Sequence, residues 1–146
     1  SSHTTVTELL HDPHVGIAQI HTTIDEIEGR MAQNPLVECP LKHTFTPGLY
    51  ARQIFMPAGT LVTSKIHRTR HQFIVSQGRV SVYNALTREV ETYEAPYHGI
   101  TEPGTRRILF NHTDVIWTTL HPTEETDLDV IEAMIIEPHD NPFLKP

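Results

Sequence analysis

The pattern of apolar and polar positions changes twice along this chain of 146 residues. Apolar residues first recur at intervals of three and four, from Ile17 through Ile24 to Met31, and acidic residues lie between them. This spacing predicts an amphipathic helix over 17–31, which ends before Pro35 because the residue preceding a proline avoids the helical conformation. Its apolar stripe would pack on the rest of the domain or on a second subunit.

The sequence pattern changes at Leu41, and the new pattern continues to about Leu120. Short segments rich in Val, Ile, Thr, Tyr and Phe alternate there with Gly- and Pro-containing turn signals, and no helical period interrupts them. The pattern predicts eight strands, near 49–56, 60–66, 71–76, 78–84, 89–94, 98–101, 105–111 and 114–120. Short strands of this kind are typical of an antiparallel sandwich or barrel.

Helical periodicity returns at 126–136, where Thr126 stands three residues before Asp129 in a relative of the capping box. Residues 1–16 have no clear period and are expected to form a loosely held arm. We therefore expect one mainly β domain. It consists of an N-terminal arm and amphipathic helix (1–40), a β-barrel (41–121), and a C-terminal helix and tail (122–146).

Composition narrows the range of functions. Acidic residues outnumber Lys and Arg by 18 to 11, and the net charge of −7 argues against sequence-independent binding to nucleic acid. No apolar run approaches the ~18 residues that would span a bilayer, and the first residues do not resemble a secretory signal. The only cysteine, Cys39, has no partner for an internal disulfide. Together these features predict a cytoplasmic protein with no membrane partner.

Two spaced motifs carry the candidate chemistry. Gly59 is followed after five residues by Lys65, after one more by His67, after three by His71 and after six by Gly78. Further along the chain, two residues separate Gly104 from Arg107, and three separate Arg107 from Asn111.

These spacings resemble the two signatures of the cupin superfamily, and the resemblance covers roughly 41–121. The resemblance implies a double-stranded β-helix, or jelly-roll barrel, whose motif side chains converge in its interior. In that family two histidines and a glutamate of the first signature, with one histidine of the second, bind a metal. By position, the resemblance assigns those four places to Lys65, His67, His71 and Arg107.

More narrowly, the segment 54–121 is similar to small cupin-like proteins encoded by bacteriophages, a group without a firm activity. The similar runs are Met56-Pro57-Ala58-Gly59-Thr60, Lys65-Ile66-His67, Pro103-Gly104-Thr105-Arg106-Arg107 and Trp117-Thr118-Thr119. This resemblance implies that the protein works in the cytoplasm of a phage-infected host.

The departures from the family pattern decide which chemistry to expect. Arg107 has no lone pair to donate, and Lys65 must lose a proton before it can bind a metal. The two histidines alone, His67 and His71, fall short of the three or four protein ligands of most metal centres. A divalent metal stays an open cofactor possibility, with His98 or His112 as the third ligand. On a regular strand, however, His112 should face away from the side occupied by Asn111.

The same departures make the pocket basic. Arg107 can grip a phosphate or carboxylate through two parallel hydrogen bonds, and Lys65 adds a second positive charge. Arg68, Arg70 and Arg106 would lie near the mouth of this pocket. Arg106 and Arg107 are adjacent on one strand, however, so their side chains should point to opposite faces of the sheet. The second signature selects Arg107 for the interior and leaves Arg106 as surface or as a partner for an acid.

The leading hypothesis is a cupin-like binding protein that holds a small anionic molecule, of which a nucleotide signal of host defence is one candidate. Lys65, His67, His71 and Arg107 would contact it. One alternative is an enzyme, either a metal-dependent oxygenase, isomerase or hydrolase using His67 and His71, or a metal-free isomerase with a histidine as acid and base. Another is a structural barrel used in assembly. In each case we expect a homo-oligomer, most simply a dimer.

Overall fold

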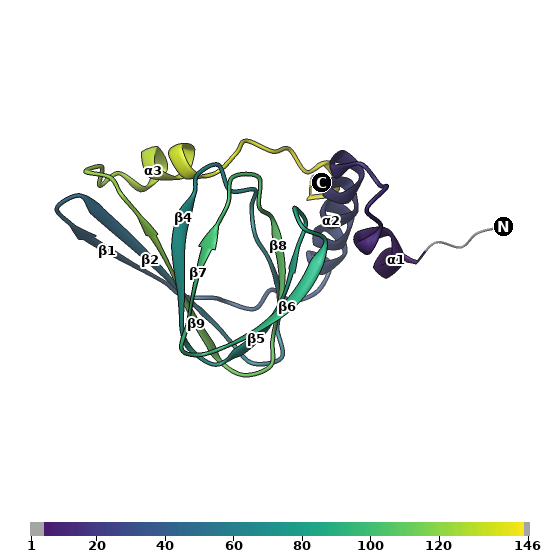
Figure 1. Cartoon of the computed structure of the whole chain (residues 1–146), viewed down its shortest axis with the longest axis horizontal. Helices are drawn as coiled ribbons and strands as arrows, with labels where there is room; N and C mark the ends of the chain where they lie inside the picture. Colours follow the sequence, from purple (N-terminus) through teal and green to yellow (C-terminus); the bar gives the residue numbers. More distant parts are fainter. Residues whose placement is uncertain (1–4, 145–146) are drawn as a thin grey trace.

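Nine strands form two antiparallel sheets that face each other in a computed structural model describing residues 5–144 (Figure 1). The strands are β1 (Leu41–Thr46), β2 (Leu49–Met56), β3 (Leu61–Thr63), β4 (His71–Gln77), β5 (Arg79–Asn84), β6 (Glu89–Glu94), β7 (Tyr97–Thr101), β8 (Arg107–Asn111) and β9 (Val115–His121). One sheet has the order β1-β2-β9-β4-β7 and the other the order β3-β8-β5-β6. The predicted mainly β, two-sheet barrel with flanking helices is confirmed.

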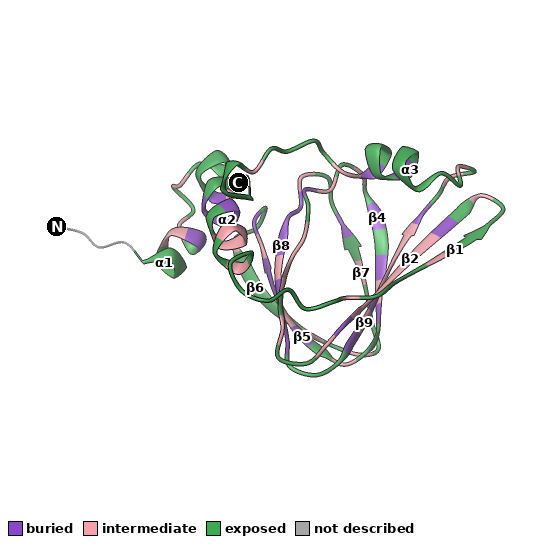
Figure 2. Ribbon diagram, turned by 180° about the vertical axis from the view of Figure 1, so that it is seen from behind, coloured by how far each residue is buried: buried purple, intermediate pink, exposed green. Residues whose placement is uncertain are grey.

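The barrel interior follows from strand alternation. Alternate residues of β8 are buried, and β4, β5 and β9 follow this alternation over most of their length, as the buried positions in Figure 2 show. The largest apolar cluster between the sheets contains Met56, Phe73, Val75, Val80, Val82, Leu109, Val115 and Trp117. Phe73 and Trp117 stack with ring centroids 4.4 Å apart.

The glycines of the two motifs lie in turns that need them. Gly59, Gly78 and Gly104 have φ angles of 77°, 91° and 90°, a region that favours glycine. At Gly78 a Cβ atom would lie only 2.1 Å from the carbonyl oxygen of Asp114, so no other residue fits there without moving the backbone.

Two helices cover the outer face of the four-stranded sheet, α1 (Val6–His11) and α2 (Ile17–Met31). The α2 bounds match the predicted ones. Ile20 and Ile24 are fully buried in a cluster with Tyr83 of β5 and the adjacent Ala85. The stripe therefore packs on the chain's own barrel, and it no longer supports the expected dimer, which stays a prediction.

Several elements differ from the expectation. The arm at 1–16 contains α1, because Thr5 caps it and the Tyr83 hydroxyl donates a hydrogen bond to the Leu10 carbonyl. Six residues are too few to show a helical period. Residues 1–4 of that arm lie outside the described part. Strand β1 was not predicted, and the strand expected over 60–66 is only β3, because the chain leaves the sheet after Thr63.

The C-terminal helix is α3 (Leu128–Ile135), followed by the short 3-10 helix η1 (Pro142–Leu144). Asp127, and not Thr126, caps α3 by accepting hydrogen bonds from the backbone N–H groups of Asp129 and Val130. Ile131 and Ile135 pack on Tyr50, which seats α3 across one end of the barrel (Figure 1). Within 5–144, no helix is both long and apolar enough to cross a membrane.

An arginine directly before β8 ties α2 to the barrel. Arg106 is 2% exposed, and its guanidinium lies 2.8 Å from the Asp25 carboxylate and 3.0 Å from that of Glu28. His139 also bonds Asp25, and Asn141 donates to Glu28. Helix α2, the barrel and the C-terminal segment therefore meet at one buried, charged network.

We predict that Arg106→Leu lowers the free energy of unfolding by about 3 to 5 kcal/mol, because it leaves two carboxylates without their buried cation. Urea denaturation followed by circular dichroism measures the change. The matched control is Arg70→Ala, which breaks the exposed Arg70–Glu102 ion pair and should cost less than about 1 kcal/mol. Equal, small losses in both variants would contradict the anchoring role of Arg106.

Candidate functional site

A pocket of about 260 Å³ opens inside the barrel, between the inner faces of β2, β8 and β9 and the segment 62–67. Glu132 of α3 and Ile136 also line it. Its wall residues are Arg52, Ile54, Met56, Val62, Thr63, Ser64, Lys65, His67, Arg107, Leu109, Trp117 and Thr119. The wall thus combines apolar side chains with a concentration of basic ones, and Glu132 is its only acid.

Arg107 is the most unusual group in this wall. It is 4% exposed, yet no described carboxylate lies within ion-pair distance of it. One terminal nitrogen donates to the Thr101 hydroxyl at 3.0 Å, and its Nε has no hydrogen-bond partner. The guanidinium carbon lies 4.9 Å from the ring centre of Phe73 and 5.5 Å from that of Trp117. Cation–π contacts therefore hold a buried positive charge that has no ion pair among the described residues.

Burial and neighbouring groups act on the pKa of Arg107 in opposite directions. Burial lowers its pKa from the ordinary value, whereas Tyr93, Glu91 and Tyr97 act in the opposite direction. An arginine stays protonated despite such a shift. The Glu91 carboxylate accepts a hydrogen bond from the Tyr93 hydroxyl at 2.7 Å.

Three histidines form a row beside Arg107. The ring centres of His67 and His71 are 5.2 Å apart, and those of His71 and His121 are 4.5 Å apart. His71 uses Nδ1 toward the Thr69 carbonyl, and His121 uses Nε2 toward the Thr119 hydroxyl. The other nitrogens, His67 Nδ1, His71 Nε2 and His121 Nδ1, are buried without a hydrogen-bond partner. Of the three rings, His67 is the one that lines the pocket.

Burial keeps these imidazoles neutral. Desolvation, strengthened by the nearby His71 and Arg107, lowers the pKa of His67 to about 3. Desolvation and the same neighbour His71 lower the pKa of His121 to about 4. The pKa of His71 is also lowered, mainly by burial. At neutral pH the pocket therefore owes its positive charge to arginine and lysine rather than to histidine.

The donor set does not fit a metal ion. Two of the four positions that the family uses hold Lys65 and Arg107, which are not among the side chains that ordinarily bind metals in proteins. Within 5–144, no group of three or more His, Cys, Asp or Glu side chains is arranged to hold a metal. The described donor set therefore does not provide a metal centre.

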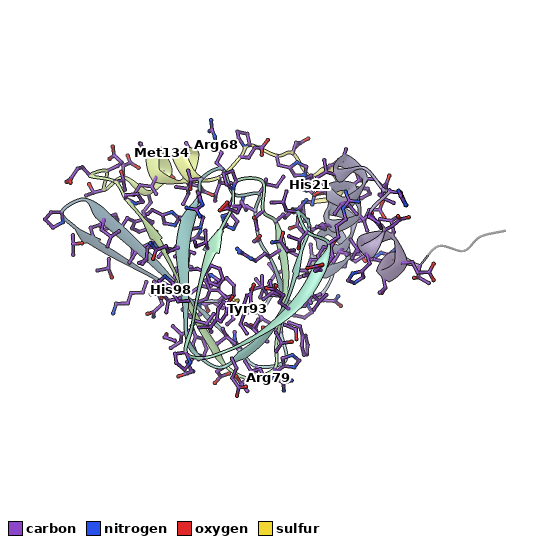
Figure 3. The ribbon with its side chains drawn as sticks, in the orientation of Figure 1. His21, Arg68, Arg79, Tyr93, His98 and Met134 are labelled. Carbon is purple, nitrogen blue, oxygen red and sulfur yellow. The ribbon has the colours of Figure 1, made fainter. Side chains whose placement is uncertain are left out.

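The two histidines considered as a third ligand lie elsewhere. His98 is exposed on β7 and bonds the side-chain amide oxygen of Gln72 at 2.8 Å (Figure 3). His112 is exposed and bonds the Ser81 hydroxyl at 2.7 Å, on the opposite side of the strand from the buried Asn111. The structure brings neither of them to His67 and His71, and the third ring of the row is His121.

The flanking arginines are also placed differently from the expectation. Arg68 donates to the Ala133 carbonyl at the end of α3 (Figure 3), and Arg70 pairs with Glu102. Arg106 is buried under α2. None of the three lines the pocket, because each is already committed to a partner outside the barrel.

Sequence reasoning missed two residues of the site, Arg52 and His121. The signal for both was strand alternation. Arg52 has the same parity along β2 as the buried Tyr50 and Met56, and His121 follows Trp117 by four positions on β9. Neither residue belongs to a spaced motif, so no motif indicated them.

No protein-family model and no curated protein matches this chain. Solved structures with cupin domains are similar to it. A cupin domain of an XRE-family transcriptional regulator from Enterobacter cloacae is 17% identical, with 58% of this chain and 98% of that chain covered and a TM-score of 0.48. An acetylacetone dioxygenase from Acinetobacter johnsonii is 14% identical, with 61% and 66% covered and a TM-score of 0.47.

A protein from Neisseria meningitidis is 6% identical, with 66% of this chain and 95% of that chain covered and a TM-score of 0.50. At such low identity the likeness concerns the fold alone. The neighbours include a regulator and an enzyme, so they indicate no particular activity for this chain.

We predict a characteristic pH dependence of stability from the buried histidines. Between pH 6.5 and about 4 the unfolded chain binds protons at His121 that the folded chain does not. The free energy of unfolding should therefore fall as the pH is lowered through this range, by up to about 1.4 kcal/mol per pH unit for this group. Above pH 6.5 the same group adds no pH dependence.

Urea denaturation at half-unit steps from pH 7 to pH 4.5 measures the slope. His121→Gln should flatten it by about one proton, whereas His98→Gln, on the exposed face, should leave it unchanged. An unchanged slope in His121→Gln would show that His121 is protonated in the folded protein.

Proposed function

We propose that this protein binds a small anion in the barrel pocket and holds it without turnover. The observation that carries the proposal is Arg107, a buried cation that lines the pocket without an ion pair in the described chain. Lys65 and Arg52 line the same pocket. A phosphate or carboxylate would supply the missing negative charge through charge-assisted hydrogen bonds.

The neighbouring arginine supports this interpretation by contrast. Arg106 is as deeply buried as Arg107, and two carboxylates neutralise it. An unpaired buried charge is expensive, and proteins compensate such charges wherever they serve structure alone. Arg107 lines the barrel pocket and has no such carboxylate among the described residues, which favours a ligand as its partner.

The histidines favour binding over catalysis. A general base works best with a pKa near the operating pH, and the pKa of His67, the histidine that lines the pocket, is lowered to about 3. Neutral imidazoles still donate a hydrogen bond to an anion from a protonated ring nitrogen. The Nδ1 atom of His67 has no other partner.

The structural-barrel alternative is less favoured, because the pocket is open and its own side chains do not fill it. The identity of the ligand has less support than the presence of an anion site. A mononucleotide would present a phosphate to Arg107, in keeping with the resemblance to phage proteins. Only that resemblance supports the proposals that the ligand is a host-defence signal and that the protein works in the host cytoplasm.

We predict that Arg107→Met and Lys65→Gln each weaken anion binding at least tenfold, on the order of 1.4 kcal/mol or more. Isothermal titration calorimetry with inorganic phosphate, citrate and adenosine monophosphate measures the affinities. Native mass spectrometry of the protein as purified shows whether an anion is retained.

The matched control is Arg79→Gln, an exposed arginine at the opposite end of the barrel from Arg68 and α3 (Figure 3). It should leave each affinity within twofold of the wild type. Because Arg107 is buried, its variant needs a thermal-melting check, whereas the exposed Lys65 tests the pocket without that concern. Undiminished affinity in both pocket variants, or no binding of any probe and no retained anion, would contradict the proposed anion pocket.

A further inference from the structure

A second and larger cavity adjoins the anion pocket. It is a groove of about 1070 Å³ between α2, α3 and the C-terminal segment. Both cavities are lined by Thr63, Ser64, Lys65, Glu132 and Ile136. A ligand anchored inside the barrel can therefore extend past Lys65 into this groove.

The groove is acidic where the pocket is basic. Asp129, Glu132 and Glu137 are exposed along it, and none of them forms an ion pair within the described residues. Of its positive groups, Arg106 is already neutralised by α2. Lys65 stands at the boundary with the pocket. The charge therefore changes sign from the barrel interior to the groove.

Apolar side chains line the groove between the acids. Met31 and Leu36 contribute from the end of α2 and the segment after it, Ile66 from the barrel side, and Leu144 from η1. The combined space is far larger than a single phosphate or carboxylate needs. Its shape and charge fit a chain with an anionic end, a cationic middle and apolar contacts.

We propose that the two cavities together bind the C-terminus of a basic peptide. The terminal carboxylate pairs with Arg107 and Lys65 in the pocket. A lysine or arginine a few residues earlier lies against Asp129, Glu132 and Glu137. This inference rests on the proposed function, since it requires the anion pocket. Capture of a terminal carboxylate is a recognised mode of peptide binding, and complementary charges set the register.

Competing ligands fit the groove less well. A second phosphate would meet the three acids and be repelled, which disfavours polyphosphates and dinucleotides. A mononucleotide fills the pocket with its phosphate but offers no cation to the acids. A basic peptide satisfies both charges at once.

The test uses the full chain, immobilised, and a random hexapeptide library with free C-termini beside the same library with amidated C-termini. Retained peptides are sequenced by mass spectrometry. We expect retention from the free-acid library only, with Lys or Arg enriched at least threefold among the positions before the last residue. Equal retention from both libraries, no such enrichment, or no retained peptide would overturn the inference.

Variants assign the two charges to their sites. Asp129→Asn/Glu137→Gln, at two exposed positions that line the groove but not the anion pocket, should abolish the Lys and Arg enrichment while the affinity for phosphate stays within twofold. Lys65→Gln and Arg107→Met should reduce retention of every peptide at least tenfold. If small anions bind through Arg107 but no peptide is retained, only this inference fails. If neither binds, the anion pocket itself is refuted.

Discussion

The alternation of side chains at the start of β8 sends two neighbouring arginines to opposite faces of one sheet, and the architecture depends on it. Arg106 points outward and joins Asp25 and Glu28, so that α2 and the C-terminal segment are fastened to the barrel. Arg107 points inward and stays without a carboxylate partner among the described residues. A shift of register by one residue would exchange these roles and bury both charges in the wrong surroundings.

The resemblance to the cupin signatures separates into two parts in the structure. The matching glycines and asparagine serve the backbone: Gly59 and Gly78 adopt positive φ angles, and Asn111 donates to the backbone and side chain of Thr60. At the ligand positions His67 matches the signature, whereas Lys65, His71 and Arg107 depart from it. Lys65, His67 and Arg107 line the pocket. The glycines and Asn111 thus shape the backbone, whereas the pocket residues set its charge, and a fold-level likeness says little about the ligand.

Local patterns predicted what depends on local physics. The isoleucine spacing predicted α2, and the turn signals predicted most strands, because helical periodicity and turn propensity depend on residues close together in the sequence. Contacts between residues far apart in the sequence were not predicted. The partners of Arg106 lie about 80 positions away on α2, and His121 joins His71 only because β4 and β9 pair. The motif register anticipated Arg107 in the pocket but offered no reason to examine Arg52 on β2.

The stack of Trp117 on Phe73 has a practical consequence. Trp117 is the only tryptophan of the chain, it lines the pocket, and its ring lies 5.5 Å from the guanidinium carbon of Arg107. An anion that draws this guanidinium away from the ring, or excludes water from around it, changes the surroundings of a single indole. The intrinsic fluorescence of the unlabelled protein is therefore a built-in optical reporter of pocket occupancy, free of interference from other indoles.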